Sequence, residues 1–128
     1  MSEAELLHSE LTRGIIGAAM EVRKILGAGF LESVYEEALA IEFDLRRIPY
    51  ERQKPIDVRY KGRPAKQFAC DFVVSNKVLV ALKAIKGISD IEQAQVLNYL
   101  KSSRLNLGLL LDFGCASLEI KRMINSNP

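Results

Sequence analysis

Hydrophobic residues in the first part of the chain recur with the spacing of an amphipathic helix. Between about Glu10 and Leu26 they return every three or four residues, at Ile15, Ala18, Ala19, Val22, Ile25 and Leu26. The segment Gly27-Ala28-Gly29 predicts the end of this helix, because glycine adopts the left-handed conformation of a helix C-terminus at little cost.

A second helix is predicted from about Leu31 to Arg47, with a stop before Pro49. One apolar face, expected to pack against the rest of the protein, consists of Leu31, Val34, Ala38, Ile41 and Leu45. Two helices therefore precede the first predicted strand.

From Ile56 the pattern of apolar residues changes to a period of two, which is typical of half-buried strands. Ile56, Val58 and Tyr60 alternate with charged residues, and the turn Lys61-Gly62-Arg63-Pro64 follows. Two further strands are predicted at Phe68 to Val74 and at Val78 to Ile85. The three residues Ser75-Asn76-Lys77 between them have the composition of a hairpin loop.

The last third of the chain predicts a helix and at least one more strand. Ser89-Asp90-Ile91-Glu92 has the S-x-x-E form of a capping box, in which both side chains satisfy free amides of the first turn, so a helix is expected from about Asp90 to Ser103. The leucine-rich segment Leu105 to Asp112 is typical of a central strand covered on both faces. Leu118 to Ile124 fits either an edge strand or a final helical turn.

The resulting order, α-α-β-β-β-α-β, predicts an α/β protein with a central mixed sheet flanked by helices. A chain of 128 residues with 48% hydrophobic and 27% charged residues fits one globular domain, 1–128. No apolar run has the length of a membrane span. The acidic start MSEAELLHSE does not resemble a secretory signal, so the expected location is the cytoplasm.

Histidine and cysteine usage excludes several kinds of site. The chain has one histidine, His8, which excludes a metal site built from several histidines and disfavours Cys/His or Ser/His catalysis. Cys70 and Cys115 lie far apart without a CxxC motif, so neither a zinc site nor a disulfide framework is indicated. Both cysteines are expected to be small hydrophobic core residues.

The net charge is only +2, but the charge is unevenly distributed along the sequence. Residues 1–45 carry 9 acidic and 3 basic side chains, whereas residues 46–67 carry 8 basic and 2 acidic ones. The basic segment has two equally weighted interpretations. It could bind the phosphates of nucleic acid, or it could protect a solvated strand edge from aggregation.

The predicted hairpin brings a candidate hydrolytic site together on one sheet face. With a loop of three residues, Asp71 lies opposite position 81, and Lys83 lies on the same face two residues further along. Two opposed carboxylates and a lysine form a typical Mg²⁺ site, because carboxylates hold the hard cation and the lysine orients or activates water. Position 81, however, is alanine.

The motifs of this chain resemble a known family. Gly29-Phe30-Leu31-Glu32-Ser33-Val34-Tyr35 matches the G-x-x-E-x-x-Y signature of the GxxExxY proteins, a branch of the PD-(D/E)XK nuclease superfamily. The similarity extends from about residue 11 to residue 124. It implies a restriction-endonuclease-like core and a site made of an upstream glutamate, an aspartate, an E-x-K motif and a Q-x-x-x-Y motif, here at Glu32, Asp71, Ala81-Leu82-Lys83, and Gln95 with Tyr99.

The resemblance implies a role for each of these residues. Asp71 and Glu32 would hold Mg²⁺ or Mn²⁺, Lys83 would act at the attacking water, and Gln95 and Tyr99 would position a DNA or RNA substrate. Ala81 stands at the expected acidic position of E-x-K and cannot ligate a metal. Three explanations compete: natural loss of activity, an engineered change, or a ligand supplied from elsewhere, such as Glu32.

Several candidate residues also have purely structural interpretations. Glu32 is favoured in the first turn of a helix by the helix dipole, and Tyr35 could simply pack. Asp71 and Lys83 could form an ion pair with each other. One face of the last predicted helix carries a polar stripe of Glu92, Gln95 and Tyr99, roughly opposite Ala94 and Leu97. Such a stripe is often only solvated.

Three hypotheses about function follow. The first is a Mg²⁺-dependent nuclease-like phosphodiesterase, impaired or inactive because of Ala81. The second is a non-catalytic module that binds nucleic acid through residues 46–67. The third is a homo-oligomeric interaction protein, such as a homodimer, in which the conspicuous polar residues form internal ion pairs.

Overall fold

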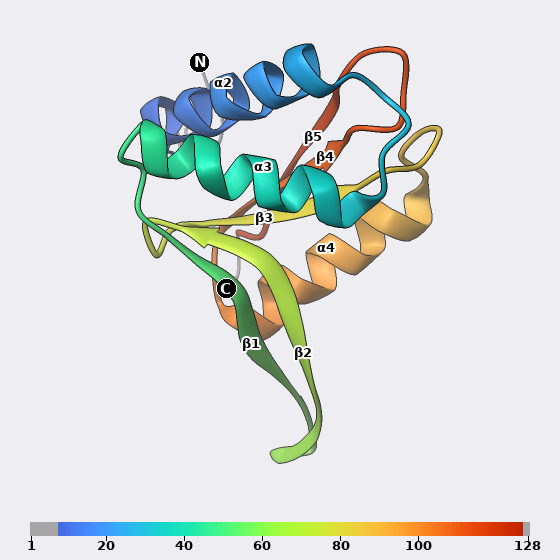
Figure 1. Cartoon of the computed structure of the whole chain (residues 1–128). Helices are drawn as coiled ribbons and strands as arrows, with labels where there is room; N and C mark the ends of the chain where they lie inside the picture. The colour runs from blue at the N-terminus through green and yellow to red at the C-terminus, as the bar shows by residue number, and fades with distance from the viewer. Residues whose placement is uncertain (1–7, 127–128) are drawn as a thin grey trace.

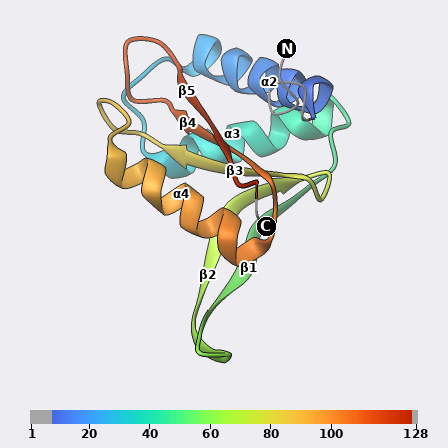
Figure 2. The ribbon, with the colours of Figure 1, turned by 180° about the vertical axis from the view of Figure 1, so that it is seen from behind.

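The structure, a computed structural model, describes residues 8–126, which form a five-stranded sheet between two layers of helices (Figure 1). Helices α2 and α3 cover one face of the sheet and α4 covers the other, as the view from behind also shows (Figure 2). The elements are, in order, α2 (Ser9–Leu26), α3 (Glu32–Leu45), β1 (Tyr50–Tyr60), β2 (Arg63–Val74), β3 (Val78–Lys83), α4 (Asp90–Ser103), β4 (Leu107–Asp112) and β5 (Glu119–Ile124). The predicted α/β class is confirmed, and the undecided last segment is a strand.

The strands are ordered β1-β2-β3-β4-β5 across the sheet. Strands β3 and β4 are parallel and are connected through α4, whereas the other neighbouring pairs are antiparallel. Pairing of Val74 with Val78 and of Phe72 with Val80 confirms the predicted three-residue hairpin loop. No helix within residues 8–126 has the length and apolar composition needed to cross a bilayer.

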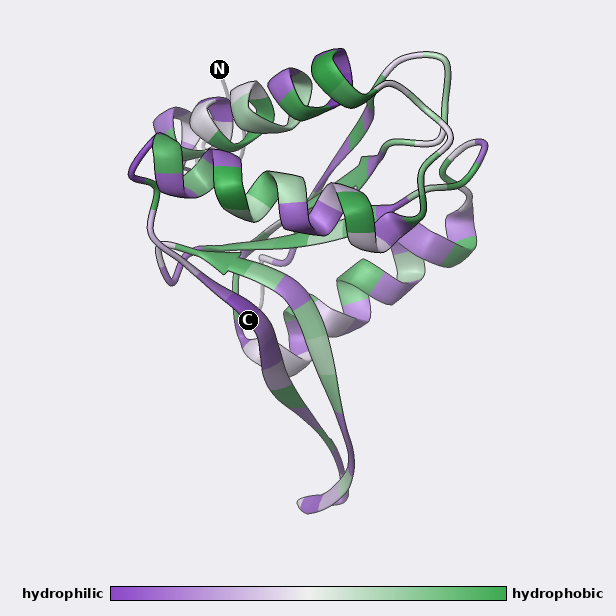
Figure 3. Cartoon of the chain, viewed as in Figure 1, coloured by the Kyte–Doolittle hydropathy of each residue, from purple (hydrophilic) through white to green (hydrophobic). Residues whose placement is uncertain are grey.

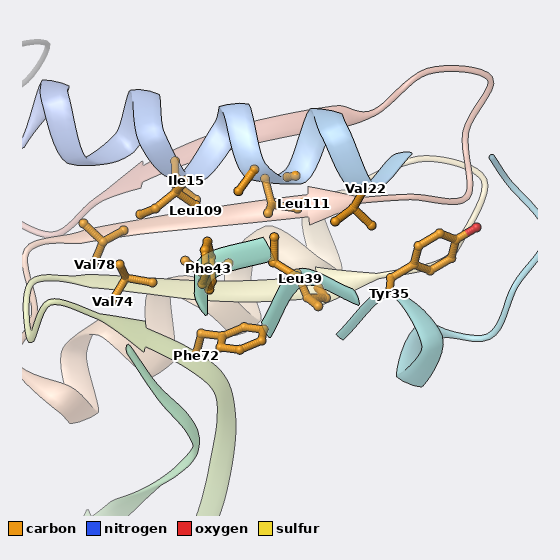
Figure 4. Close-up of a cluster of buried hydrophobic side chains, with 14 of the residues drawn as sticks. Ile15, Val22, Tyr35, Leu39, Phe43, Phe72, Val74, Val78, Leu109 and Leu111 are labelled. Atoms are coloured by element: carbon orange, nitrogen blue, oxygen red, sulfur yellow. The ribbon is translucent and has the colours of Figure 1, made fainter. Parts of the chain in front are cut away.

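The two faces of the sheet bury two separate hydrophobic clusters, because successive strand residues point to opposite faces. On β3, Val78, Val80 and Leu82 belong to the cluster shared with α2 and α3, in which Figure 4 shows Val78. Leu79 and Ala81 belong instead to the cluster under α4. All six residues of β4 are buried, as predicted for a central strand.

Helix α3 packs with a different face from the one predicted. Its buried residues are Tyr35, Leu39, Ala40 and Phe43. Of the predicted face, Ala38 packs partly against the core, but the larger residues are exposed, with relative exposures of 78% for Leu31, 58% for Ile41 and 73% for Leu45. The helix is apolar on two sides, and the side with the two large aromatic rings fills the space over the sheet. In α2 the predicted face is buried except at its end, where Ile25 is 70% exposed.

Strands β1 and β2 form a long hairpin arm, defined here as residues 54–70, which projects away from the helical layers (Figures 1 and 2). Strand β1 begins at Tyr50, six residues earlier than predicted, and β2 already begins at Arg63. The predicted turn is therefore reduced to Lys61 and Gly62. The arm is rich in hydrophilic positions (Figure 3). Apolar alternation therefore did not predict the full length of its strands.

Strand β3 and helix α4 also correct details of the prediction. Strand β3 ends at Lys83 rather than at Ile85. The Ser89 hydroxyl accepts a hydrogen bond from the Ile91 amide at 3.3 Å and donates one to the Glu92 carboxylate. The Ser89 hydroxyl lowers the pKa of Glu92 most, and the Ser89 backbone amide lowers it as well, as expected for the predicted capping box. Ala94, expected on the apolar side of α4, is exposed.

The connection between α2 and α3 is fixed by Tyr35. Its hydroxyl donates to the Gly27 carbonyl at 2.6 Å and accepts from the Phe30 amide at 3.3 Å. Its buried ring stacks on Phe113 with 4.7 Å between the centroids. Gly29 has φ +106°, a conformation that side-chain-bearing residues rarely adopt. The glycine and the tyrosine of the G-x-x-E-x-x-Y motif therefore set the chain path, which leaves its glutamate as the candidate for chemistry.

We expect Tyr35→Phe to lower the free energy of unfolding by about 1–2 kcal/mol, because two backbone groups lose their partner while the ring packing remains. Urea denaturation followed by circular dichroism measures this change. Tyr60→Phe is the matched control, since Tyr60 is 68% exposed on the arm, and it should change the free energy little. Equal effects of the two substitutions would contradict the assigned role of the Tyr35 hydroxyl.

Candidate active site

The candidate site lies where β2 separates from β3. The ladder between these strands ends at the pair Phe72 and Val80, one residue before Asp71 would face Ala81. At this point the Asp71 carboxylate accepts a hydrogen bond from the Leu82 amide, with 2.7 Å between Oδ2 and N. A side chain thus replaces the backbone of β2 as the partner of β3. The predicted register is correct, but Asp71 occupies the opening between two diverging strands.

A glutamine from β1 bridges Asp71 to a second carboxylate. Gln53 has φ +51° and is omitted from the regular pairing of β1 with β2. Its Nε2 lies 3.4 Å from Asp71 Oδ1 and 2.5 Å from Glu36 Oε1. The irregular conformation of this residue therefore places one amide group between two acidic side chains.

Glu36 is a site residue that the sequence prediction missed. It lies one turn after Glu32 on α3, and its side chain is 14% exposed. Arg52 of β1 donates from Nε to Glu36 Oε2 at 2.9 Å, and the Arg52 Nη2 also lies 2.6 Å from Glu37. The spacing of four residues from Glu32 was the available signal, because residues at i and i+4 share a helix face.

Burial and crowding of negative charge raise the pKa of Asp71. Desolvation raises it most, the Leu82 amide lowers it, and the adjacent Glu36 carboxylate, within hydrogen-bonding reach, raises it again. Gln53 lowers it slightly. Two carboxylates this close repel each other when no cation is bound, so the Glu36 and Asp71 pair is a site that a cation would stabilise.

Glu32 stands at the rim of the same cluster. It is the first residue of α3, and much of its side chain is exposed. Partial desolvation raises its pKa, the negative charges of Asp71 and Glu36 raise it further, and Lys83 lowers it. The Glu32, Glu36 and Asp71 oxygens are not all within 4.8 Å of one another. A shared cation would therefore require a rotation of the exposed Glu32 side chain.

Lys83 ends β3 beside these carboxylates. Its charge lowers the pKa of Glu32 and, as a smaller effect, that of Glu92 on α4. Among the salt bridges of residues 8–126, none joins Lys83 to Asp71. The alternative in which these two residues merely form an ion pair with each other is therefore not supported.

Ala81 is part of the hydrophobic core on the α4 side and is 5% exposed. Its cluster includes Val96 and Leu100 of α4. A methyl group in this environment offers no ligand to a cation, so the E-x-K position contributes packing in this chain.

The Q-x-x-x-Y residues lie on the flank of α4 rather than opposite its packed side. Val96 and Leu100 face the sheet, and Gln95 and Tyr99 beside them are partly buried. Tyr99 stacks on Phe68 of the arm with ring centroids 4.1 Å apart. Desolvation raises the pKa of Tyr99, and the negative charge of Asp71 raises it further.

A second cluster of possible ligands, formed by Asp112, Cys115 and Glu119, spans the end of β4 and the start of β5 and has ligand atoms within 4.8 Å of one another. The fully buried Asp112 already accepts hydrogen bonds from three backbone amides, those of Ile85, Gly87 and Gly114. The Cys115 thiol donates to Asp112 and Glu119, and burial raises its pKa to about 11. These groups hold the β3–α4 loop, and Cys115 is a hydrogen-bonding residue rather than the expected core hydrophobe.

Comparison with protein families places residues 9–123 within the model of the PD-(D/E)XK nuclease superfamily. The chain belongs to this superfamily. Comparisons with curated proteins and with solved structures gave no significant match. Nucleases of the PD-(D/E)XK superfamily generally use Mg²⁺ or Mn²⁺. The Glu36 and Asp71 pair with Glu32 offers oxygen donors of the kind that these hard cations prefer.

We expect Asp71→Asn to stabilise the metal-free protein by about 1 kcal/mol at neutral pH, which is roughly 3–5 °C in Tm for a chain of this size. The folded state binds the Asp71 proton more tightly than the unfolded state, because the pKa of Asp71 is raised. The charged Asp71 carboxylate therefore destabilises the folded protein at pH values above its folded-state pKa. This effect is absent below the ordinary aspartate pKa of 3.8.

Thermal unfolding of both proteins in a chelator, from acidic to neutral pH, tests this sign. The increase in Tm caused by Asp71→Asn should become smaller as the pH falls toward the ordinary pKa of aspartate. Asp57→Asn on the exposed part of the arm is the control, since its amide would still accept the Gln67 hydrogen bond. A loss of stability for Asp71→Asn at neutral pH would show that the carboxylate is well compensated without a metal.

Proposed function

We propose that this protein is a Mg²⁺- or Mn²⁺-dependent nuclease-like phosphodiesterase acting on DNA or RNA, with turnover that is weak or absent because Ala81 replaces the E-x-K carboxylate. The observation that carries this proposal is the convergence of Glu36 and Asp71 on Gln53 at the opening between β2 and β3, next to the end of β3 at Lys83. Membership of the nuclease superfamily supports the choice of substrate class.

The chemistry of the donors fits a divalent cation. Asp71 and Glu36 would hold it, and Glu32 would complete the set. A carboxylate has about four lone-pair positions, so Asp71 can keep the Leu82 amide and Glu36 can keep Arg52 while each still offers a free position. Glu36 would then take the place of the carboxylate that is missing at position 81.

When bound, the cation would supply a Lewis acid that polarises the phosphate and lowers the pKa of a water. Lys83 would place its ammonium group at the attacking water and offset charge on the phosphate oxygens. Gln95 and Tyr99 would position the substrate, the latter from a ring fixed by its stacking on Phe68. Hydrolysis would then form one P–O bond to water and break the P–O bond to the leaving nucleoside oxygen.

The decisive substitution is Ala81→Glu, with Ala81→Gln as a control of the same shape without charge. Both side chains are larger than the buried space at position 81, so each should cost about 1–3 kcal/mol of stability. Only Ala81→Glu should gain Mg²⁺-dependent cleavage. It should also bind Mn²⁺ at least about tenfold more tightly than Ala81→Gln in calorimetry, because only the carboxylate adds a ligand.

Cleavage is measured on single-stranded, duplex and branched DNA and RNA, after circular dichroism has established that both variants are folded. If folded Ala81→Glu and the original chain are equally inactive on every substrate, the nuclease proposal fails. If the Gln variant is as active as the Glu variant, the activity does not depend on a carboxylate at this position.

A non-catalytic nucleic-acid-binding role is the first alternative. The packing of Ala81 among apolar side chains favours it, because this position is integrated into the core rather than left as a gap. This alternative requires affinity that falls steeply with salt and is unchanged by a chelator.

A homodimer is the second alternative, and the exposed apolar stripe of α3 favours it. Leu31, Val34, Ile41 and Leu45 are all exposed on this helix, and contiguous apolar surface of this kind is typical of interaction sites. We expect Ile41→Lys to convert a dimer to a monomer in sedimentation velocity. Ile91→Lys is the matched control, since Ile91 is 80% exposed on α4 on the other side of the sheet. A monomer for the unaltered chain would remove this alternative.

A further inference from the structure

A groove of about 600 Å³ lies between strand β1 and the C-terminal end of α4, outside the carboxylate site. One wall is the outer half of β1, from Lys54 to Arg59, and the other is the segment from Lys101 to Leu105. Figures 1 and 2 both place β1 on the side of the arm toward this end of α4. Strand β2, on the other side of the arm, carries Asp71 and contacts Tyr99 through Phe68. The arm therefore separates the groove from the candidate active site.

The groove is strongly basic. Lys54 and Arg59 from β1 and Lys101 and Arg104 from α4 line it, against one acidic side chain, Asp57. Across the part of the chain that the structure describes, the salt bridges involve Lys54 but none of the other three cations. Arg59 also donates a hydrogen bond to the Gly62 carbonyl at 3.3 Å, which leaves its charge unneutralised, so all three positive charges can attract an anion from solution.

The α4 wall alone has a structural explanation, but the β1 wall does not share it. Cations are favoured at a helix C-terminus, which accounts for Lys101 and Arg104. Lys54 and Arg59 belong to a different element. A register shift between Val58 and Arg59 changes the direction of the residues that follow it, and Arg59 lines the groove. The helix dipole therefore does not explain why cations from both α4 and β1 line the same groove.

The extent of the positive charge indicates a polyanion rather than a small anion. From Lys54 to Lys61 the strand extends over roughly 23 Å at the usual rise per residue. Exposed Lys61, Arg63 and Lys66 continue the basic surface to the tip of the arm, beside the 68% exposed ring of Tyr60. A row of phosphates matches such a row of cations, and an exposed aromatic ring at its end can stack on a base.

We propose that the groove between β1 and the end of α4 binds the sugar-phosphate backbone of a nucleic acid, holding a part of the substrate that lies outside the cleavage site. This inference rests on the proposed function for the identity of the polyanion, but it does not depend on catalysis. Protection of the β1 edge by charge accounts for basic residues on the strand, yet it does not explain those on the facing helix.

The test is fluorescence anisotropy with labelled single-stranded and duplex DNA and RNA, in a chelator and at several salt concentrations. Two double variants neutralise one wall each: Lys101→Gln with Arg104→Gln, and Lys54→Gln with Arg59→Gln. The matched control is Arg13→Gln with Lys121→Gln, which removes the same charge from exposed positions on α2 and on the opposite sheet edge. Circular dichroism establishes that all three are folded.

Each groove variant should weaken binding at least about tenfold and should lower the slope of log affinity against log salt by about 1.4–1.8, as expected for two lost phosphate contacts. The control should change both quantities much less. Equal losses in all three variants would overturn the inference, because they would reflect net charge alone. Absence of binding by the unaltered chain would overturn it as well.

The outcomes separate this inference from the proposed function. If Ala81→Glu cleaves nucleic acid while the groove variants bind normally, the groove assignment fails and the nuclease proposal stands. If the groove variants lose binding while Ala81→Glu remains inactive, the protein is a nucleic-acid-binding module and only the nuclease proposal fails.

Discussion

The hydrogen bond between the Asp71 carboxylate and the Leu82 amide is the interaction on which the rest of the candidate site depends. It satisfies the backbone of β3 at the point where β2 leaves the sheet, so the two strands can separate without an unpaired amide. The separation exposes the carboxylate cluster on one side and starts the projecting arm on the other. Although this hydrogen bond lowers the pKa of Asp71, desolvation and the neighbouring Glu36 keep it raised, and a bound cation would relieve that crowding of negative charge.

The molecule separates its charges by position. The carboxylates Glu32, Glu36 and Asp71 gather beside the first turns of α3, and the cations of the groove gather at the far end of α4. A polyanionic substrate would be attracted by the second region and repelled by the first until a divalent cation is bound. Binding and cleavage would then depend on different conditions, with salt governing the former and the cation the latter.

The sequence was sufficient for the fold class, the hairpin register and the start of α4, because local periodicity and turn composition determine these features. The sequence did not predict the features that depend on tertiary packing. Helix α3 is apolar on two sides, and only the space above the sheet selects the side with Phe43. The early part of β1 lacks apolar alternation and is held by pairing with β2. Glu36 was missed because its importance arises from Gln53 and Arg52, which lie 17 and 16 residues away in sequence.

The residues Arg52 and Gln53 are consecutive in β1, and they hold Glu36 and Asp71 from the base of the arm. The base of the arm therefore contacts the carboxylate pair through these two side chains. Any ligand that binds the arm would therefore contact the same strand, β1, that holds Glu36 and Asp71 through Arg52 and Gln53.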